Sequence, residues 1–361
     1  MTKLEQLIQD LCPNGVKMVK LGDVVDVLRG KRLTKSELSE DAQYNVYHGG
    51  LEPLGKYHLA NREADTVMVI NVGASAGTVG YSDMPFWSSD GCFCLSHSNE
   101  VNNKYLYYYL QTETNTLVSR VRRAGIPTLD SNSVLSLQIT LPPLAVQSEI
   151  VRILDKFTLY KSELAAELAA RCKQYEHYRN QLLTFDENTK RVKLGEMAEL
   201  KAGSFVSRSE ITDVNTDRFP CYGGNGIRGY VNHYSHEGQF SIIGRQGALC
   251  GCVHYVTGKF YATEHAVVVR TKEIVLSKYL YYILVHANLN QFKSQGAQPG
   301  LAVSNLNQLE FPLPPLEVQE RIVAILDRFD ALCHDIREGL PAEIELRQKQ
   351  YEHYRDKLLT F

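Results

Sequence analysis

Two short motifs have the spacing of catalytic or ligand-binding sites. Gly73-Ala-Ser-Ala-Gly77 fits the Gly-x-Ser-x-Gly pattern, which places the nucleophilic serine of a hydrolase between a strand and a helix. Gly224-Asn-Gly-Ile-Arg-Gly229 fits the Gly-x-Gly-x-x-Gly pattern of a dinucleotide site, which also requires a following helix. The residues that follow, Thr78–Tyr81 and Tyr230–Tyr234, favour a strand or a turn instead. The sequence therefore predicts glycine turns here, with neither a nucleophile nor a cofactor-binding loop.

The two Cys-x-Cys pairs, Cys92/Cys94 and Cys250/Cys252, are the residues best suited to hold a metal. Structural zinc sites use four ligands, and their cysteines are usually two to four residues apart, a pattern that these pairs do not match. The 11 histidines form no ligand pair at helical spacing. We therefore expect buried free thiols, no metal site and no catalytic group in this chain.

Two clusters of basic residues, Arg29-Gly-Lys-Arg32 and Arg120-Val-Arg-Arg123, could contact phosphate groups. The net charge of −2 argues against a simple nucleic-acid-binding protein, because such proteins usually carry a basic excess. The clusters therefore have two interpretations. They are either solvated surface runs or the local basic part of a binding face.

The composition, with 44% hydrophobic and 22% charged residues, is that of a globular protein. A length of 361 residues allows two or three domains. No apolar run has the length needed to cross a bilayer, and the N-terminal residues lack the pattern of a signal peptide. The sequence predicts a cytoplasmic protein, in which disulfides are not expected.

An internal repeat organises the whole chain. Leu-Pro-Pro-Leu-x-Val-Gln at 141–147 returns at 313–319, and Ile-Val-x-Ile-Leu-Asp at 150–155 returns at 322–327. Val-Lys-Leu-Gly at 19–22 likewise returns at 192–195. A repeat of this length indicates two copies of one structural unit, each a globular segment followed by a long helix.

The repeat predicts five segments of a mixed α/β (α+β) protein with approximate two-fold symmetry. These are an N-terminal helix over 1–15, a first domain over 16–143, a first helix over 144–185, a second domain over 186–315 and a second helix over 316–361. Within the domains, 66–70 and 240–243 are predicted strands, and 104–111 and its copy at 278–282 are predicted helices.

The helix after Pro142-Pro143 has apolar residues at alternating spacings of three and four, which is typical of a coiled-coil seam. The seam from Ile150 to Phe185 covers 36 residues, which would extend over roughly 54 Å. The second copy has the same seam with four residues inserted, and Pro341 lies in this insertion. We expect Pro341 to bend or break that helix. The two seams are expected to pair with each other.

The combination of these motifs resembles the specificity subunit of a type I restriction–modification system. The most specific residues are Val-Lys-Leu-Gly-Asp/Glu, which opens each domain, and Leu-Pro-Pro-Leu-x-x-Gln-x-x-Ile-Val-x-Ile-Leu-Asp, which opens each helix. The stretch at 223–230 is also similar to the family's recognition domains. The resemblance implies two target-recognition domains that each read one half of a split DNA sequence. It also implies an antiparallel coiled coil that spaces them and docks methyltransferase subunits.

The resemblance further implies that base readout comes from polar and basic residues in loops that differ between the two halves. In the first domain the candidates are Arg29, Lys31, Arg32, His48, Arg120, Arg122 and Arg123. In the second domain they are Ser204, Tyr222, Asn225, Arg228, Arg245, Gln246 and Gln298. Arginine suits guanine, and Asn or Gln suits adenine, because each pair forms two parallel hydrogen bonds. Candidates for the partner-helix interface are the repeated residues Tyr175, His177, Tyr178, Tyr351, His353 and Tyr354.

The same resemblance implies a subunit without catalysis or a cofactor of its own. S-adenosylmethionine, ATP and magnesium would be bound by partner subunits, namely two methyltransferase subunits and the endonuclease/translocase subunits. Double-stranded DNA with a bipartite target would be the ligand. Two other functions stay open: a coiled-coil scaffold that does not bind DNA, and a metal-dependent nuclease in one of the domains.

Overall fold

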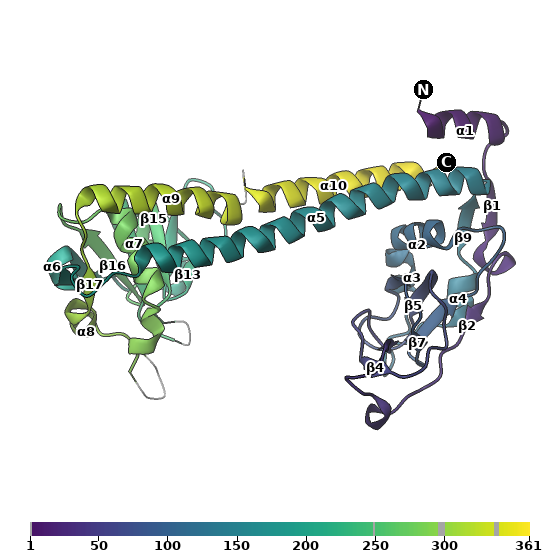
Figure 1. The fold of residues 1–361 in the computed structure, drawn as a ribbon, viewed down its shortest axis with the longest axis horizontal. Coiled ribbons are helices and arrows are strands. Elements are labelled where there is room, and N and C mark those ends of the chain that lie inside the picture. Colours follow the sequence, from purple (N-terminus) through teal and green to yellow (C-terminus); the bar gives the residue numbers. More distant parts are fainter. Residues whose placement is uncertain (1, 248–249, 295–299, 336–338) are drawn as a thin grey trace. The chain divides into compact units, whose positions relative to one another are not determined.

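The computed structural model describes residues 2–247, 250–294, 300–335 and 339–361. The chain divides into two compact units. Unit 1 comprises Met1–Ala165 and Ile344–Phe361, and unit 2 comprises Ala166–Glu343. Figure 1 shows that each unit combines a globular part with part of a helix pair. The expected mixed α/β fold with two domains and long helices is confirmed.

Unit 1 carries a small mixed domain between its N-terminal helix and the long helix α5. Its helices are α1 (Lys3–Leu11), η1 (Leu21–Asp23), η2 (Lys35–Glu37), α2 (Asn103–Thr112), α3 (Thr114–Ser119), α4 (Ser131–Leu135), the first part of α5 (Leu144–Leu183) and most of α10 (Leu340–Leu359). Its strands are β1 (Lys17–Lys20), β2 (Val27–Leu28), β3 (Tyr44–Tyr47), β4 (Gly55–Tyr57), β5 (Thr66–Ile70), β6 (Val79–Ser82), β7 (Trp87–Ser88), β8 (Cys92–Leu95) and β9 (Gln138–Leu141).

The strands of unit 1 form three small sheets. One has the order β2-β8-β5-β6, the second β4-β3-β7, and β1 pairs with β9. All five residues of β5 are buried, because Val67 and Val69 pack in the cluster that contains α2, while Met68 and Ile70 pack in a second cluster with Phe86. A strand covered on both faces reads as a continuous apolar run, which explains why Thr66–Ile70 was predictable from sequence.

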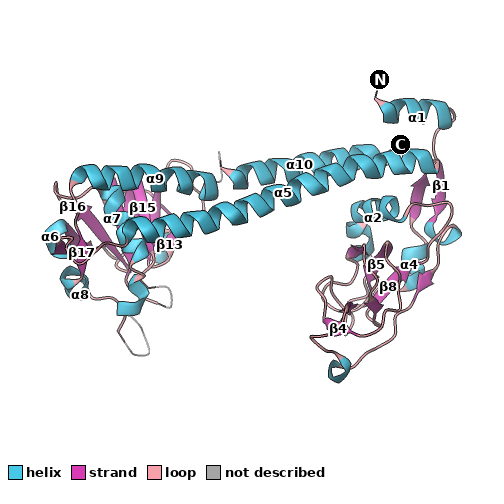
Figure 2. Ribbon diagram, viewed as in Figure 1, coloured by secondary structure: helices cyan, strands magenta, loops and turns pink. Residues whose placement is uncertain are grey.

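Unit 2 repeats this order with longer strands. Its helices are α6 (Leu194–Met197), η3 (Arg208–Glu210), α7 (Ser277–His286), η4 (Leu289–Phe292), α8 (Val303–Gln308), α9 (Leu316–His334) and the second part of α5. Its strands are β10 (Arg191–Lys193), β11 (Ala198–Ala202), β12 (Phe219–Gly223), β13 (Gly226–Val231), β14 (His236–Gly244), β15 (Val253–Ala262), β16 (Ala266–Thr271) and β17 (Glu310–Pro312). The main sheet has the order β11-β16-β14-β15-β12-β13, and β10 pairs with β17 (Figure 2).

Both domains attach to their helices through the same buried hydrogen bonds. Gln147 Nε2 donates to the carbonyl oxygen of Pro142 at 2.7 Å, and Gln319 Nε2 donates to that of Pro314 at 2.9 Å. Each glutamine also accepts a backbone N–H with its side-chain oxygen, from Asn102 in unit 1 and from Leu276 in unit 2. Because both glutamines are fully buried, these bonds fix where each helix begins relative to its domain.

The helices pair in antiparallel order within each unit. In unit 1, Phe157 of α5 stacks on Tyr354 of α10 with ring centroids 5.3 Å apart. In unit 2, Phe329 of α9 stacks on Tyr178 of α5, also at 5.3 Å. The two stacks are the same contact in the two copies of the repeat, so the seam predicted from the apolar spacing does pair with its partner seam.

The second repeated helix, over 316–361, is broken, as expected from Pro341. The segment forms α9, which ends at His334, and α10, which begins at Leu340. Pro341 lies in the first turn of α10, where a missing N–H costs nothing because no intrahelical acceptor is available there. The break therefore follows from the proline inside the four-residue insertion, as the sequence suggested.

Candidate functional site

The loops at one end of each domain occupy equivalent positions, and backbone hydrogen bonds establish the equivalence. In unit 1 the N–H of Leu129 donates to the carbonyl oxygen of Asn71 at 2.8 Å. In unit 2 the N–H of Leu301 donates to the carbonyl oxygen of Arg245 at the same distance. The N–H groups of Lys31 and Ser204 likewise donate to the carbonyls of Ser88 and Ala262 at 2.9 and 3.0 Å. Each domain thus presents the same set of loops with different side chains.

Glycines let the first of these loops approach the strand behind it. A Cβ atom on Gly30 would lie 2.0 Å from the carbonyl oxygen of Ser89, and one on Gly203 would lie 2.2 Å from that of Ala262. No real side chain tolerates such a contact with backbone, so only glycine fits at either position. The residues on each side, Arg29 and Lys31 in unit 1, are held at the rim of the same face.

In unit 1 a groove of about 420 Å³ brings together three of the arginines singled out from the sequence. Arg29, Arg120 and Arg122 line it together with Asp90 and Asp130. Three guanidinium groups against two carboxylates leave the groove with an excess of positive charge. Nothing in the residue pattern indicated that the two basic clusters, 29–32 and 120–123, share one groove.

The three arginines differ in how the protein holds them. Arg120 Nη1 donates to the carbonyl oxygen of Ser133 at 2.6 Å and lies 3.1 Å from Ser136 Oγ, so it caps the end of α4. Arg122 Nη2 makes one long contact of 3.4 Å with Thr128 Oγ1. Arg120 is therefore held in place by two contacts to the end of α4, and all three arginines are exposed along the groove.

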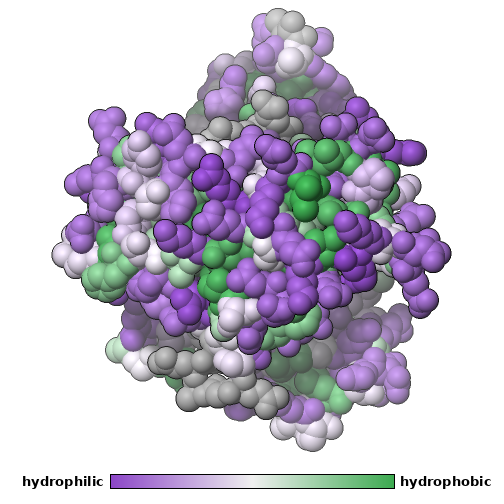
Figure 3. All heavy atoms as spheres, turned by 90° about the vertical axis from the view of Figure 1, so that its left-hand side faces the viewer, coloured by the Kyte–Doolittle hydropathy of each residue, from purple (hydrophilic) through white to green (hydrophobic). Residues whose placement is uncertain are grey.

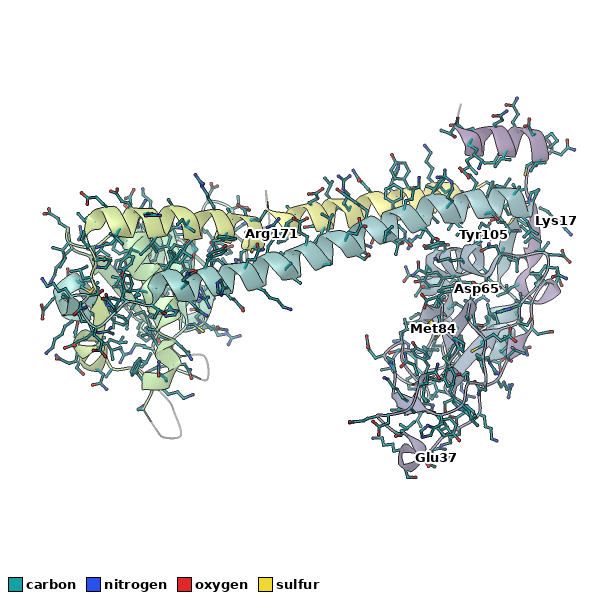
Figure 4. The ribbon with its side chains drawn as sticks, viewed as in Figure 1. Lys17, Glu37, Asp65, Met84, Tyr105 and Arg171 are labelled. Carbon is teal, nitrogen blue, oxygen red and sulfur yellow. The ribbon has the colours of Figure 1, made fainter. Side chains whose placement is uncertain are left out.

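The other candidates of unit 1 lie around this groove. His48 is half-buried, and its Nδ1 lies 3.2 Å from the N atom of Gly91 and 3.1 Å from Asp90 Oδ1, so it shapes the turn at 89–91. Lys31, Arg32 and Arg123 are exposed on the loops that flank the groove. Figure 4 shows Glu37 at the end of unit 1 opposite to Tyr105, which packs near the helix pair.

In unit 2 the candidates spread over the hairpin β12–β13 and the segment after β14. Asn225 is exposed in the hairpin turn, and Arg228 is exposed on β13. Tyr222 is half-buried against Phe260 with ring centroids 5.8 Å apart, and burial raises the pKa of its hydroxyl. Gln298 lies outside the described residues. The remaining candidate on the loops, Ser204, is exposed.

Gln246 is the candidate in unit 2 that the fold orients most clearly. Its side chain is hydrogen-bonded to His265 Nδ1, and His265 Nε2 lies 3.1 Å from Glu264 Oε1. Arg245, directly before it, has its Nε atom buried with no hydrogen-bond partner. Sequence reasoning missed Glu264 and His265. The one signal in the sequence was the internal repeat, which aligns Glu264 with Asp90 and His265 with Gly91.

The repeated tyrosines of the helices pack inside the protein's own helix pairs. Tyr175 is buried against Phe329, with ring centroids 6.4 Å apart. Tyr351 donates a hydrogen bond of 3.0 Å to Gln111 Oε1. Tyr178 and Tyr354 stack across the pairs but stay about two-fifths exposed, and His177 and His353 are exposed beside them.

The motifs with catalytic spacing behave as glycine turns. Gly73 and Gly77 have φ values of +96° and +93°, and the strand β6 follows where a hydrolase would have a helix. The strand β13 likewise begins at Gly226, within the second glycine motif. All eight cysteines are free thiols. Within the described ranges, no cluster of three or more His, Cys, Asp or Glu residues could hold a metal ion, and no helix is long and apolar enough to cross a membrane.

Comparison with known proteins identifies this duplicated architecture. The profile of the type I restriction modification DNA specificity domain matches residues 13–174 and again 186–346. The chain belongs to this family. The resemblance stated from its motifs is thereby confirmed.

Relatives and a solved structure agree with the family assignment. The type I restriction enzyme EcoprrI specificity subunit of Escherichia coli is 37% identical over 87% of this chain and 80% of its own length. A putative type I specificity subunit of Haemophilus influenzae is 29% identical over 100% of this chain and 98% of its own length. The crystal structure of the S subunit from M. genitalium has the same fold, with a TM-score of 0.65 at 19% identity and 96% of each chain covered.

The family defines the role of the chain. It is a DNA-recognition subunit of a type I restriction–modification system, and such subunits leave catalysis to other subunits. Subunits of this class act with methylase and restriction subunits and bind DNA.

Proposed function

We propose that the loop end of each unit binds one half of a bipartite DNA target, with the groove of unit 1 contacting one half-site and the Gln246 region of unit 2 contacting the other. The observation that carries this proposal is the equivalence of the loops combined with the difference of their side chains. Two domains with one scaffold and two faces suit two different half-sites, as identical domains in a dimer suit two identical ones.

The chemistry of the two faces supports different kinds of readout. Arg29 and Arg122 in unit 1 can contact phosphates or the O6 and N7 atoms of guanine. Gln246 in unit 2 has its amide oxygen engaged by His265, and its amide NH₂ group remains to contact a base edge. Arg120 and His48 have a second role in this proposal, because Arg120 Nη1 also donates to the carbonyl oxygen of Ser133 and His48 Nδ1 also accepts the N–H of Gly91.

The proposal extends to the partner subunits. Two methyltransferase subunits would dock on the helix pairs, and the exposed parts of Tyr178, Tyr354, His177 and His353 are candidates for that contact. S-adenosylmethionine, ATP and magnesium would be bound by the partners, which would flip the target adenine out of the duplex. A cytoplasmic location, with access to chromosomal DNA, is part of the same proposal.

Methylome sequencing tests this function. Cells that express the chain with its methylase subunit should carry a bipartite adenine-methylated motif that cells without the chain lack. The double variant Arg29→Ala/Arg122→Ala should relax or abolish recognition of one half of the motif only, and Gln246→Ala should affect the other half only. Lys17→Ala, at an exposed position of β1, is a matched control and should leave the motif unchanged.

The coiled-coil scaffold makes the opposite prediction. An assembled complex with an active methylase subunit would then show the same methylome with and without the chain. A change in both half-sites from either variant would contradict the assignment of one half-site to each unit.

A further inference from the structure

Two cysteines face each other across the helix pair of unit 2. Cys172 lies on α5, and Cys333 lies in the last turn of α9. Both belong to one apolar cluster, in which Cys333 is buried and Cys172 is partly buried. Tyr175, one turn after Cys172, packs on His334, the neighbour of Cys333, with ring centroids 5.5 Å apart. The two thiol groups therefore lie in the same layer of the seam.

The internal repeat supports these facing positions. The alignment of the aromatic stack of unit 1 with that of unit 2 places Lys161 at the position of Cys333. It also places Gln348 at the position of Cys172. In unit 1 the two side chains are in direct contact, because Lys161 Nζ donates to Gln348 Oε1 at 2.7 Å. Side chains at the two positions thus point toward each other, and unit 2 carries a thiol at each.

The surroundings of Cys333 keep its thiol protonated. Burial, followed by the neighbouring thiol of Cys172, raises the pKa of Cys333 to about 11. The carboxylate of Asp330 adds to this shift, and Arg171 opposes it. A protonated thiol is a poor nucleophile, so Cys333 is not the first of the two to be oxidised. Cys172, which solvent reaches, is the first.

The end of α9 lets the two sulfur atoms approach further. Cys333 is the last residue but one of α9, and helix ends adjust more easily than helix centres. Figure 4 labels Arg171, directly before Cys172, on α5 beside this end of α9. The outer surface of unit 2 is mostly hydrophilic in Figure 3, with apolar side chains in small groups. A small shift of the last turn, within the inward-facing apolar seam, is what a disulfide bond of about 2 Å requires.

We propose that Cys172 and Cys333 form a reversible disulfide when a peroxide oxidises the chain, and that this bond ties α9 to α5. With hydrogen peroxide, the sulfur of Cys172 attacks one oxygen and the O–O bond breaks. Cys172 becomes a sulfenic acid, and its thiol proton and the leaving hydroxide form water. The sulfur of Cys333 then attacks that of Cys172 and the S–O bond breaks. The leaving hydroxide takes the proton of Cys333 and forms a second water.

The balance of this reaction is two thiols oxidised to one disulfide and one hydrogen peroxide reduced to two waters. A reversible bond of this kind is compatible with a compartment that otherwise keeps thiols reduced. It would close a ring that contains almost the whole of unit 2. Because such a ring restricts the unfolded chain, oxidation should stabilise unit 2 and leave unit 1 unchanged. The inference goes beyond the proposed function and does not depend on DNA binding.

Peptide mapping of the full-length chain tests the bond. After treatment with hydrogen peroxide and blocking of free thiols with N-ethylmaleimide, digestion should yield a linked peptide that contains Cys172 and Cys333. Its mass should be lower than that of the two free peptides by two hydrogen atoms, and dithiothreitol should remove it. Cys172→Ser should abolish the linked peptide and leave Cys333 blocked by N-ethylmaleimide. Oxidation of Cys172 to a sulfinic acid without a link to Cys333 would overturn the proposal.

Transfer of the pair to unit 1 is the matched control. Lys161→Cys/Gln348→Cys, in a chain that also carries Cys172→Ser, should form the equivalent bond under the same treatment. This result would show that facing positions of the repeat suit a disulfide. If the transferred pair links and the native pair does not, Cys172 and Cys333 serve packing alone and the proposal fails.

Unfolding in urea and a glutathione buffer test the consequence. Hydrogen exchange should show that peroxide raises the urea midpoint of unit 2 alone, and Cys172→Ser should remove this shift. The pair should be reduced when reduced glutathione predominates and oxidised when glutathione disulfide predominates. A bond that persists in excess reduced glutathione is a permanent crosslink, and this outcome, like an unchanged urea midpoint, would contradict a reversible tie between α9 and α5.

Discussion

The loops of unit 1 are basic where those of unit 2 are small and neutral. Arg29 lies next to Gly30, and the counterpart beside Gly203 is Ala202. The backbone groups of Arg122 and Thr128 form two hydrogen bonds with each other in unit 1. In unit 2 the N–H of Ser294 donates to the carbonyl oxygen of Gly300, so Ser294 is the counterpart of Arg122. The backbone of the face is thus common to both units, and the side chains that project from it differ.

The buried junctions between domain and helix, in contrast, are the same in both units. Gln147 and Gln319 make matching hydrogen bonds, and Tyr105 and Tyr279 donate to equivalent carbonyls at 2.9 and 3.0 Å. A buried polar group that loses its partner costs stability, whereas an exposed loop side chain can change at little cost. The comparison teaches that a few buried polar groups fix each domain to its helix, whereas the exposed loop side chains can diverge.

The largest effect is expected at the buried glutamines. Gln147→Ala and Gln319→Ala should each lower the free energy of unfolding of their unit by about 3 kcal/mol, because each leaves buried backbone groups unpaired. Urea unfolding followed by hydrogen exchange resolves the two units. Gln181→Ala, at an exposed position of α5, is the control and should change stability by less than about 0.5 kcal/mol. A large effect in one unit alone would break the equivalence of the junctions.

The next largest effect is expected at Glu149 near the start of α5, and it should be absent at its counterpart Arg321 near the start of α9. Glu149→Gln should destabilise unit 1 by about 2 kcal/mol, because the carboxylate is bonded to Arg152 and Lys3, whereas Arg321→Gln should leave the stability of the chain unchanged. Equal effects of the two variants on thermal unfolding would show that the ion pairs of Glu149 do not distinguish the two helix starts.

The same carboxyl group predicts a pH dependence. Hydrogen bonds from Arg152, aided by Lys3, lower the pKa of Glu149 from 4.5 to about 2. A lowered pKa in the folded state means that the stabilisation is present above pH 4.5 and is lost as the pH falls toward 2. The difference in stability between wild type and Glu149→Gln should therefore shrink over that range. A constant difference would show that the ion pairs contribute nothing.

A smaller effect is expected on the loop faces. Arg29→Ala/Arg122→Ala in the assembled complex should weaken DNA binding about tenfold, and the slope of log affinity against log salt should fall by about one for each phosphate that is no longer bound. Ser294→Ala in unit 2 should change the affinity less than twofold. A weaker affinity with an unaltered salt slope would assign the arginines to bases instead of phosphates.

The smallest effect concerns two tyrosines at the junctions. Tyr108 donates to Asp155 Oδ1 at 2.6 Å, and Tyr282 donates to Asp327 in the same way. Tyr108→Phe and Tyr282→Phe should each cost about 1 kcal/mol, because each carboxylate keeps its lysine partner, Lys104 or Lys278. Unequal losses in thermal unfolding would show that the two copies of this network have diverged.

Much of the fold was predictable because the repeat made each half a test of the other. The strand Thr66–Ile70 and the helices around 104 and 278 lie where the apolar pattern placed them. The glycine motifs were correctly interpreted as turns because the residues that follow each motif favour a strand or a turn over a helix. The interrupted second helix was only half predicted. Pro341 indicated a break, but the length of α9 and α10 depends on packing against α5.

The sequence alone determined the duplication, the family and the helix seams, because these are carried by residue types at fixed spacings along the chain. Tertiary structure decided which polar residues meet. Arg29 and Arg122 come from segments more than 90 residues apart, and only the folded chain places them in one groove. The same holds for the two helix starts. Val146 and Val318 lie in similar sequence contexts, yet only Val146 is buried, in the apolar cluster of unit 1 that also contains Leu4 of α1.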